Sequence, residues 1–175
     1  MKLLKSVTFV TACVTAGLAC AASDGALAGN SNGAAALSLE IGSKVRVRNV
    51  DDIPLGTYSG VGDLTANMSY CVYRSGGEDY RMKLSTDQGA FQVYSTLAAA
   101  SISYLVRVDD DLDASDGEIL GYDSWSAASM TGHERANCQG QENGSIWVSF
   151  FAANLQAAPT ASDYQTTMIL TIEPI

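Results

Sequence analysis

Residues 37–47 read Leu-Ser-Leu-Glu-Ile-Gly-Ser-Lys-Val-Arg-Val, and apart from Ser43 every second side chain is apolar. A period of two predicts a half-buried β-strand, or two strands in line across Gly42-Ser43. A helix cannot gather these side chains on one face. The stretch therefore indicates an all-β chain. Its apolar members are Leu37, Leu39, Ile41, Val45 and Val47.

The same alternation returns several times further along the chain. It covers residues 64–72, 80–84, 91–94, 102–108 and 164–172. The first two of these runs flank a short glycine-rich turn, so we expect them to form a hairpin. The run at 145–151 is apolar on both faces, as expected for a central strand. Six or seven strands with little helix signal favour one antiparallel β-sandwich of the immunoglobulin type over residues 37–175, with a closed barrel as the alternative.

Charge is scarce and its balance is negative. The 175 residues hold 10 Lys+Arg and 19 Asp+Glu, a formal charge of −9, and only 17% of residues are charged. Soluble globular proteins average about 25%. Binding to a phosphate backbone needs clustered Lys and Arg, so nucleic acid is not an expected partner.

The N-terminus has the pattern of a secretory signal peptide. A basic start is followed by the apolar run 6–18 and by the small-residue site Ala19-Cys20-Ala21. We expect cleavage after Ala21 or Ala22, with Ala28 as an alternative site, and export from the cell. A lipoprotein signal around Val10-Thr11-Ala12-Cys13 is a rival interpretation. The apolar run is too short to span a bilayer.

Cleavage would leave a flexible segment at 22–36, rich in Gly, Asn, Ser and Ala. Loss of Lys2 and Lys5 would make the mature charge 8 − 19 = −11. Cys71 and Cys138 would remain, and an even pair in an oxidising compartment predicts one disulfide, with two free thiols as the alternative.

The segment 109–118 is acidic, and 109–136 as a whole has no periodicity. Alternate carboxylates at Asp109, Asp111 and Asp113 are the kind of oxygen ligand that Ca²⁺ prefers. An EF-hand loop needs glycine at its sixth position, where Asp109 as the first residue would place Ala114. A solvated loop is therefore the preferred interpretation, and Ca²⁺ a weak alternative.

No catalytic constellation stands out, so we expect no enzyme, no catalytic residue, no metal and no cofactor. His133 is the one histidine, and no Gly-x-Ser-x-Gly sequence is present. A disulfide between Cys71 and Cys138 would leave no thiolate nucleophile.

Three segments resemble the subunits of bacterial chaperone–usher fimbriae, in particular the archaic branch with a domain of the spore coat protein U type. They are Tyr70-Cys71-Val72-Tyr73, then Tyr80-Arg81-Met82-Lys83-Leu84-Ser85, and the terminal stretch from Asp163-Tyr164 to Glu173-Pro174. Together with the alternating strands at both ends of the mature chain, they cover most of it.

The resemblance implies a sandwich that lacks one strand. A periplasmic chaperone would supply that strand first, and the N-terminal extension of a neighbouring pilus subunit would then replace it. The donor side chains would be Leu37, Leu39, Ile41, Val45 and Val47. The groove edge would hold Tyr164, Met168, Leu170 and Ile172.

The protein would then pass through the periplasm and an outer-membrane usher to a fimbria at the cell surface, where it would serve adhesion as part of a polymer, without being an integral membrane protein. The alternative function is a self-contained secreted or periplasmic sandwich that binds carbohydrate, protein or Ca²⁺ through residues 109–136.

Overall fold

The computed structural model describes Asn30 and residues 37–175, and these belong to two units of the chain, 1–41 and 42–175. The expected signal peptide (1–21) and, apart from Asn30, the expected flexible segment (22–36) lie outside the described residues. Every strand belongs to the second unit. Within it, all strand pairings are antiparallel, which confirms the all-β prediction.

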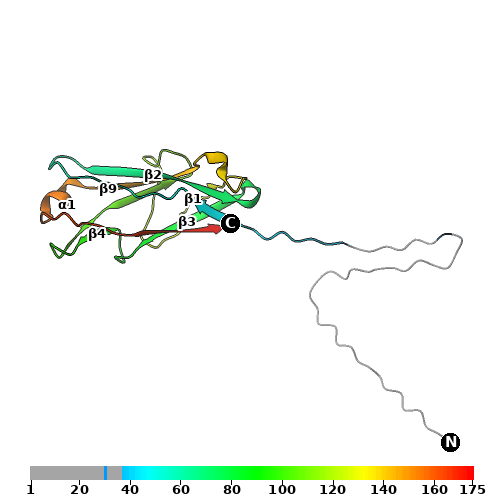
Figure 1. Cartoon of the computed structure of the whole chain (residues 1–175), viewed down its shortest axis with the longest axis horizontal. Coiled ribbons are helices and arrows are strands. Elements are labelled where there is room, and N and C mark those ends of the chain that lie inside the picture. The colour runs from blue at the N-terminus through cyan, green and yellow to red at the C-terminus, as the bar shows by residue number, and fades with distance from the viewer. Residues whose placement is uncertain (1–29, 31–36) are drawn as a thin grey trace, which may run out of the picture. The chain divides into compact units, whose positions relative to one another are not determined.

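Two sheets form the layers of this unit (Figure 1). The larger has the order β1-β2-β9-β6-β7 and the smaller the order β10-β3-β8, while β4 and β5 pair with each other. Backbone bonds between Tyr94 in β4 and Gln165, at 2.9 and 3.1 Å, join the β4–β5 pair to the chain ahead of β10. The strands are β1 (Val45–Arg48), β2 (Leu64–Arg74), β3 (Asp79–Thr86), β4 (Gln92–Ser95), β5 (Ala100–Ser103), β6 (Leu105–Asp109), β7 (Glu118–Ile119), β8 (Met130–Thr131), β9 (Gly144–Phe150) and β10 (Met168–Pro174).

Side chains from both sheets meet in one hydrophobic core. Alternate residues of β2, β3, β6 and β9 point into it, as the period-two patterns predicted. Its fully buried apolar members include Tyr70, Val72, Tyr80, Met82, Leu84, Val106 and Ile146. The central strand β9 pairs with β2 on one side and β6 on the other, as expected from its two apolar faces.

The predicted hairpin of residues 64–72 and 80–84 is wrong. β2 and β3 lie in different sheets, and the 3-10 turn η1 (Ser75–Gly77) carries the chain from one sheet to the other. Gly76 and Gly77 have φ of 82° and 68°, a region that suits glycine. A short glycine-rich loop can thus connect strands across a sandwich as well as within a sheet.

The two terminal strands are shorter than the alternation suggests. Residues 37–44 and 164–167 keep the pattern but have no regular strand structure. β1 ends where Asn49 takes φ of 57°, a left-handed conformation that asparagine tolerates better than most residues. Residues 49–63 then run on without strand pairing to β2.

Sequence patterns also gave no sign of the helix α1 (Ala152–Ala157), which follows β9 directly. Among the described residues, no helix has the length and apolar character needed to cross a bilayer.

Candidate functional site: an apolar groove between two sheet edges

A groove of about 590 Å³ lies in the second unit, between the segment 50–56 and residues 164–170. Its floor consists of core side chains, so the groove opens directly onto the hydrophobic interior. The floor residues are Met68, Leu84, Val93, Tyr104, Ile146, Val148 and Phe150.

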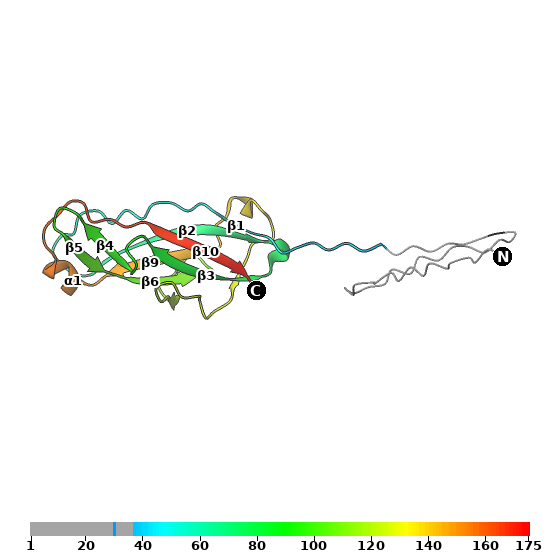
Figure 2. The same ribbon diagram turned by 90° about the horizontal axis from the view of Figure 1, so that it is seen from below.

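One wall of the groove is formed by β10, the outer strand of the smaller sheet, and by residues 164–167 ahead of it. The other wall is the segment 50–56, which follows β1. β10 pairs with β3 on one side only, and β1 is the terminal strand of the larger sheet. Figure 2 shows β10 and β1 on the same side of the unit. The outer edge of β10 therefore offers backbone groups beside a cavity whose floor is apolar and whose walls include polar residues such as Asp51, Asp52 and Thr166. An added strand would use this combination.

Tyr104 is the polar exception in the floor of the groove. Its side chain is only 7% exposed, and its phenolic oxygen has no hydrogen-bond partner among the described residues. Burial, and to a smaller degree the negative charge of Asp87, raises the pKa of Tyr104 to about 12. The phenol is neutral at physiological pH, so the floor carries no charge.

Of the residues expected at the groove edge, Tyr164, Met168 and Leu170 line the cavity. Ile172 lies further along β10, where it packs against the core outside the lining. In β10 the outward-facing Ile169 is 51% exposed, whereas Met168 and Leu170 are half-buried.

The five expected donor residues divide into two groups. Val45 and Val47 lie in β1, where they pair with Arg74 and Val72 of β2 and pack against the core of their own chain. Leu37, Leu39 and Ile41 belong to the first unit and are 98%, 84% and 78% exposed. Of the five, only Leu37, Leu39 and Ile41 have side chains that do not pack in a hydrophobic core.

The segment 50–56 forms a groove wall that the sequence patterns did not assign, since it reads as a turn-rich loop. Ile53 and Leu55 line the cavity and pack against the core. They continue the odd-numbered phase of Val45 and Val47, and this was the signal available in the sequence. Pro54 and the two aspartates before Ile53 concealed it.

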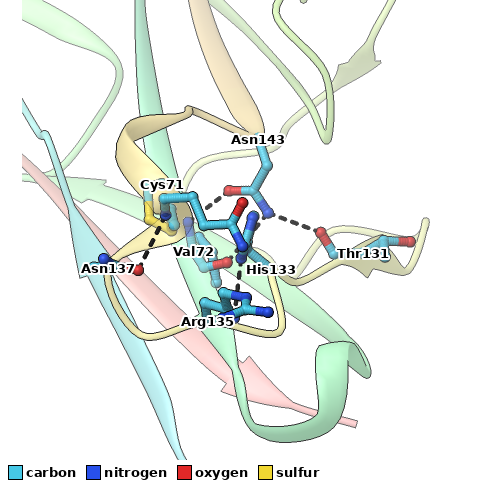
Figure 3. The surroundings of a disulfide bond; sticks show 9 residues. Cys71, Val72, Thr131, His133, Arg135, Asn137 and Asn143 are labelled. Atoms are coloured by element: carbon cyan, nitrogen blue, oxygen red, sulfur yellow. Dashed lines mark hydrogen bonds between the residues drawn. A yellow bond between two sulfur atoms is a disulfide. The ribbon is translucent and has the colours of Figure 1, made fainter.

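Cys71 and Cys138 form a disulfide, which confirms the predicted pairing. It joins β2 to η2 (Cys138–Gly140), and Figure 3 shows the loop around it lying on β2. There the backbone of His133 accepts from Arg74 N at 3.0 Å and donates to Val72 O at 2.8 Å. The ring Nδ1 of His133 accepts from Arg135 N at 3.0 Å.

The side chain of Asn143 completes this attachment (Figure 3). Its Oδ1 accepts from Val72 N at 2.8 Å, and its Nδ2 donates to Val72 O and to Thr131 O, both at 3.1 Å. The amide thereby copies the two hydrogen bonds of a paired strand residue, directly ahead of Gly144, where β9 begins.

The carboxylates at Asp109, Asp111 and Asp113 are bonded within their own loop. They accept hydrogen bonds from backbone N–H groups of their own loop, those of Asp110 at 2.8 Å, Asp113 at 2.7 Å and Ser115 at 3.1 Å. Among the residues that the structure describes, no group of three or more His, Cys, Asp or Glu side chains is placed to hold a metal ion. Bonds from Ser115 lower the pKa of Asp113, while burial raises that of Asp109.

Comparison of the chain with protein-family models and with curated proteins finds no match to either.

Proposed function

We propose that the protein is a structural subunit of a bacterial surface pilus, assembled by donor-strand exchange with the help of a periplasmic chaperone and an outer-membrane usher. The observation that carries the proposal is the groove, where core side chains lie open between β10 and the segment 50–56, and where no strand of the described residues pairs with the outer side of β10. A strand from another molecule would complete an immunoglobulin-like sandwich there.

The donor in this proposal is the segment around Leu37, Leu39 and Ile41. Alternate side chains of an extended strand point to one face, so all three would enter the groove together. Full burial contributes about 1.5–3 kcal/mol per side chain, hence roughly 5–9 kcal/mol as an upper bound. Association costs about 4–15 kcal/mol, so backbone pairing with β10 must add to the side-chain term.

Val45 and Val47 fall outside the donor segment in this proposal, because β1 already uses them within the chain. One further feature supports it, since a disulfide suits the oxidising periplasm through which such subunits travel.

The test uses the mature chain and a synthetic peptide of residues 34–43. We expect the peptide to bind, to raise the melting temperature of the chain and to block its self-association. Substitution of Leu37, Leu39 and Ile41 by Asp should abolish self-association, because each carboxylate would have to be buried. The matched control, Ser38→Ala with Glu40→Gln, changes the opposite face of the same segment and should associate normally.

A mature chain that melts cooperatively as a monomer, with no response to the peptide, would sink the proposal. That result would favour the self-contained binding module instead.

A further inference from the structure

Three cations near the start of the second unit have no acidic partner. Arg74, Arg81, Lys83 and Arg135 each form an ion pair, with Glu78, Glu173, Asp123 and Glu134 respectively. Lys44, Arg46 and Arg48 form none with any residue that the structure describes. The residues that alternate with these cations, Val45 and Val47, pack against the core. Lys44 and Arg46 are exposed. We call these three residues the basic stripe.

The opposite end of the same unit is acidic. Figure 1 places β1 and the C-terminus at one end, with α1 and β4 at the other. Asp63 lies at the α1 end, since its Oδ1 accepts from Ala152 N at 2.8 Å. Asp163 lies beside β4, since its Oδ2 accepts from Thr96 N at 2.9 Å and Leu97 N at 3.0 Å. Asp87 accepts from Thr166 Oγ1 at 2.7 Å and from Thr167 N at 3.0 Å, next to the groove.

Hydrogen bonds favour the ionised form of two of these groups, Asp87 and Asp163. They hold the pKa of Asp87 below its usual value, and bonds from Ser95 and then Thr96 hold that of Asp163 at about 2. Every ion pair found among the described residues is formed by a cation elsewhere, so the acid end keeps its charge.

We infer that the basic stripe of one molecule docks against the acid end of a second copy of this chain, formed by Asp63, Asp87 and Asp163. The inference rests on the proposed function, because strand exchange is what would bring the two surfaces together. The basic stripe and the acid end carry opposite charges, which favours contact between these two surfaces, whereas two acid ends repel each other. The occupant of the groove is then selected by charge as well as by its apolar side chains.

Strand geometry brings the basic stripe to the correct end. Every ladder in this unit is antiparallel, and antiparallel pairing is the slightly more stable kind. A donor antiparallel to β10 has its C-terminal end beside Met168, where β10 begins. The chain that follows the donor, starting at Lys44, leaves the groove next to Thr166 and Thr167, to which Asp87 is bonded.

The test compares the association rate of mature chains by light scattering at about 20 mM and about 500 mM NaCl, because salt screens such contacts. The variant Lys44→Gln/Arg46→Gln/Arg48→Gln should associate about tenfold more slowly at low salt, and the difference should vanish at high salt. Arg135→Gln, which removes a cation already paired with Glu134, is the matched control and should behave like the unmodified chain.

A second variant, Asp63→Asn/Asp87→Asn/Asp163→Asn, removes the three charges. The amide oxygen can still accept the bonds made to Asp63 and Asp87, and at position 163 it can keep those from Thr96 and Leu97, while the bond from Ser95 to the other oxygen is lost. This variant should slow association to the same extent, and the two triple variants combined should be no slower than either alone, because the surfaces act on each other. Strictly additive effects, or a basic-stripe variant that associates normally at low salt, would overturn the inference.

The peptide of residues 34–43 separates this inference from the proposed function, since it contains no Lys or Arg. It should bind the groove of the unmodified chain and of the basic-stripe variant equally well. Binding of the peptide together with charge-independent association would leave the proposed function standing and the inference refuted. Failure of the peptide to bind any chain would refute both.

Discussion

Strand pairing stops at two places in this molecule, beside β2 and at the outer edge of β10, and the two places differ in whether the chain itself covers them. Beside β2, directly ahead of the start of β9, the loop 131–143 takes over, fixed by the Cys71–Cys138 disulfide, by the backbone of His133 and by the amide of Asn143. Where β10 has its outer edge, no described residue continues the sheet, and core side chains line an open groove. The chain therefore covers the unpaired stretch of β2 with its own loop, whereas none of its described residues covers the outer edge of β10.

The largest effect is expected from the closed flank, on removal of the disulfide. Its loop spans 67 residues, and the chain-entropy model gives such a crosslink about 4 kcal/mol of stability. Cys71→Ser/Cys138→Ser should lower the free energy of unfolding by about that amount in a urea titration. The unmodified chain should lose the same amount of stability when the disulfide is reduced. A loss below about 1 kcal/mol would mean that hydrogen bonds alone hold the loop.

Matched leucine truncations compare a filled core with the open groove. Leu120 is 3% exposed and packs in the core, so Leu120→Ala should cost about 3 kcal/mol in the isolated chain. Leu170 is half-buried in the groove wall, so Leu170→Ala should cost only about 1 kcal/mol there. The Leu170 variant should instead bind the peptide of residues 34–43 about tenfold more weakly, as measured by calorimetry. Equal costs in the isolated chain would contradict an open groove.

Asn143 tests how the closed flank is built. Asn143→Ala leaves the fully buried N–H of Val72 without its acceptor, which should cost about 2 kcal/mol in urea unfolding. Asn137→Ala removes an exposed acceptor of one bond, from Gln139 N, and should cost about 0.5 kcal/mol. Similar values for the two variants would show that Asn143 does not substitute for a strand.

The smallest effect concerns pH and the end of the groove. Unfolded aspartate titrates near pKa 3.9, and bonds from Ser95 and then Thr96 lower the pKa of folded Asp163 to about 2. The stabilisation is therefore complete above about pH 4 and is lost as the pH falls toward 2. Hydrogen exchange at Thr96 and Leu97 should accelerate in that window, and in Asp163→Asn it should lose this pH dependence. Exchange unchanged down to pH 2 would refute the link.

The sequence predicted those elements whose pairing partners lie in the same chain. Alternation located β2, β3, β6 and β9, and an even pair of cysteines located the crosslink. The hairpin prediction failed because a glycine-rich turn carries no information about whether the next strand joins the same sheet. The prediction of strand structure for residues 37–44 failed for another reason. Alternation shows only that a segment has one apolar face, and these residues pair with no described strand of their own chain.

The groove itself was only partly predictable. Met168 and Leu170 follow from the phase of the last strand, whereas the wall at Ile53 and Leu55 depends on the left-handed turn at Asn49, which diverts the chain from β2. The floor depends on which core side chains remain uncovered, and this is set by the separation of two sheets.

The position of the disulfide also has a mechanical consequence. The last pair of the β1–β2 ladder joins Arg48 to Cys71, so tension applied to the chain ahead of β1 reaches the crosslinked residue after only four pairs. Beyond that point the force passes from Cys71 to Cys138 through sulfur, and the residues between them stay out of its path. At about 3.4 Å per residue, the crosslink withholds roughly 220 Å of chain from extension. Under load, only the residues outside the crosslink, which include β9 and residues 64–70 of β2, can be extended, while the chain between Cys71 and Cys138 cannot.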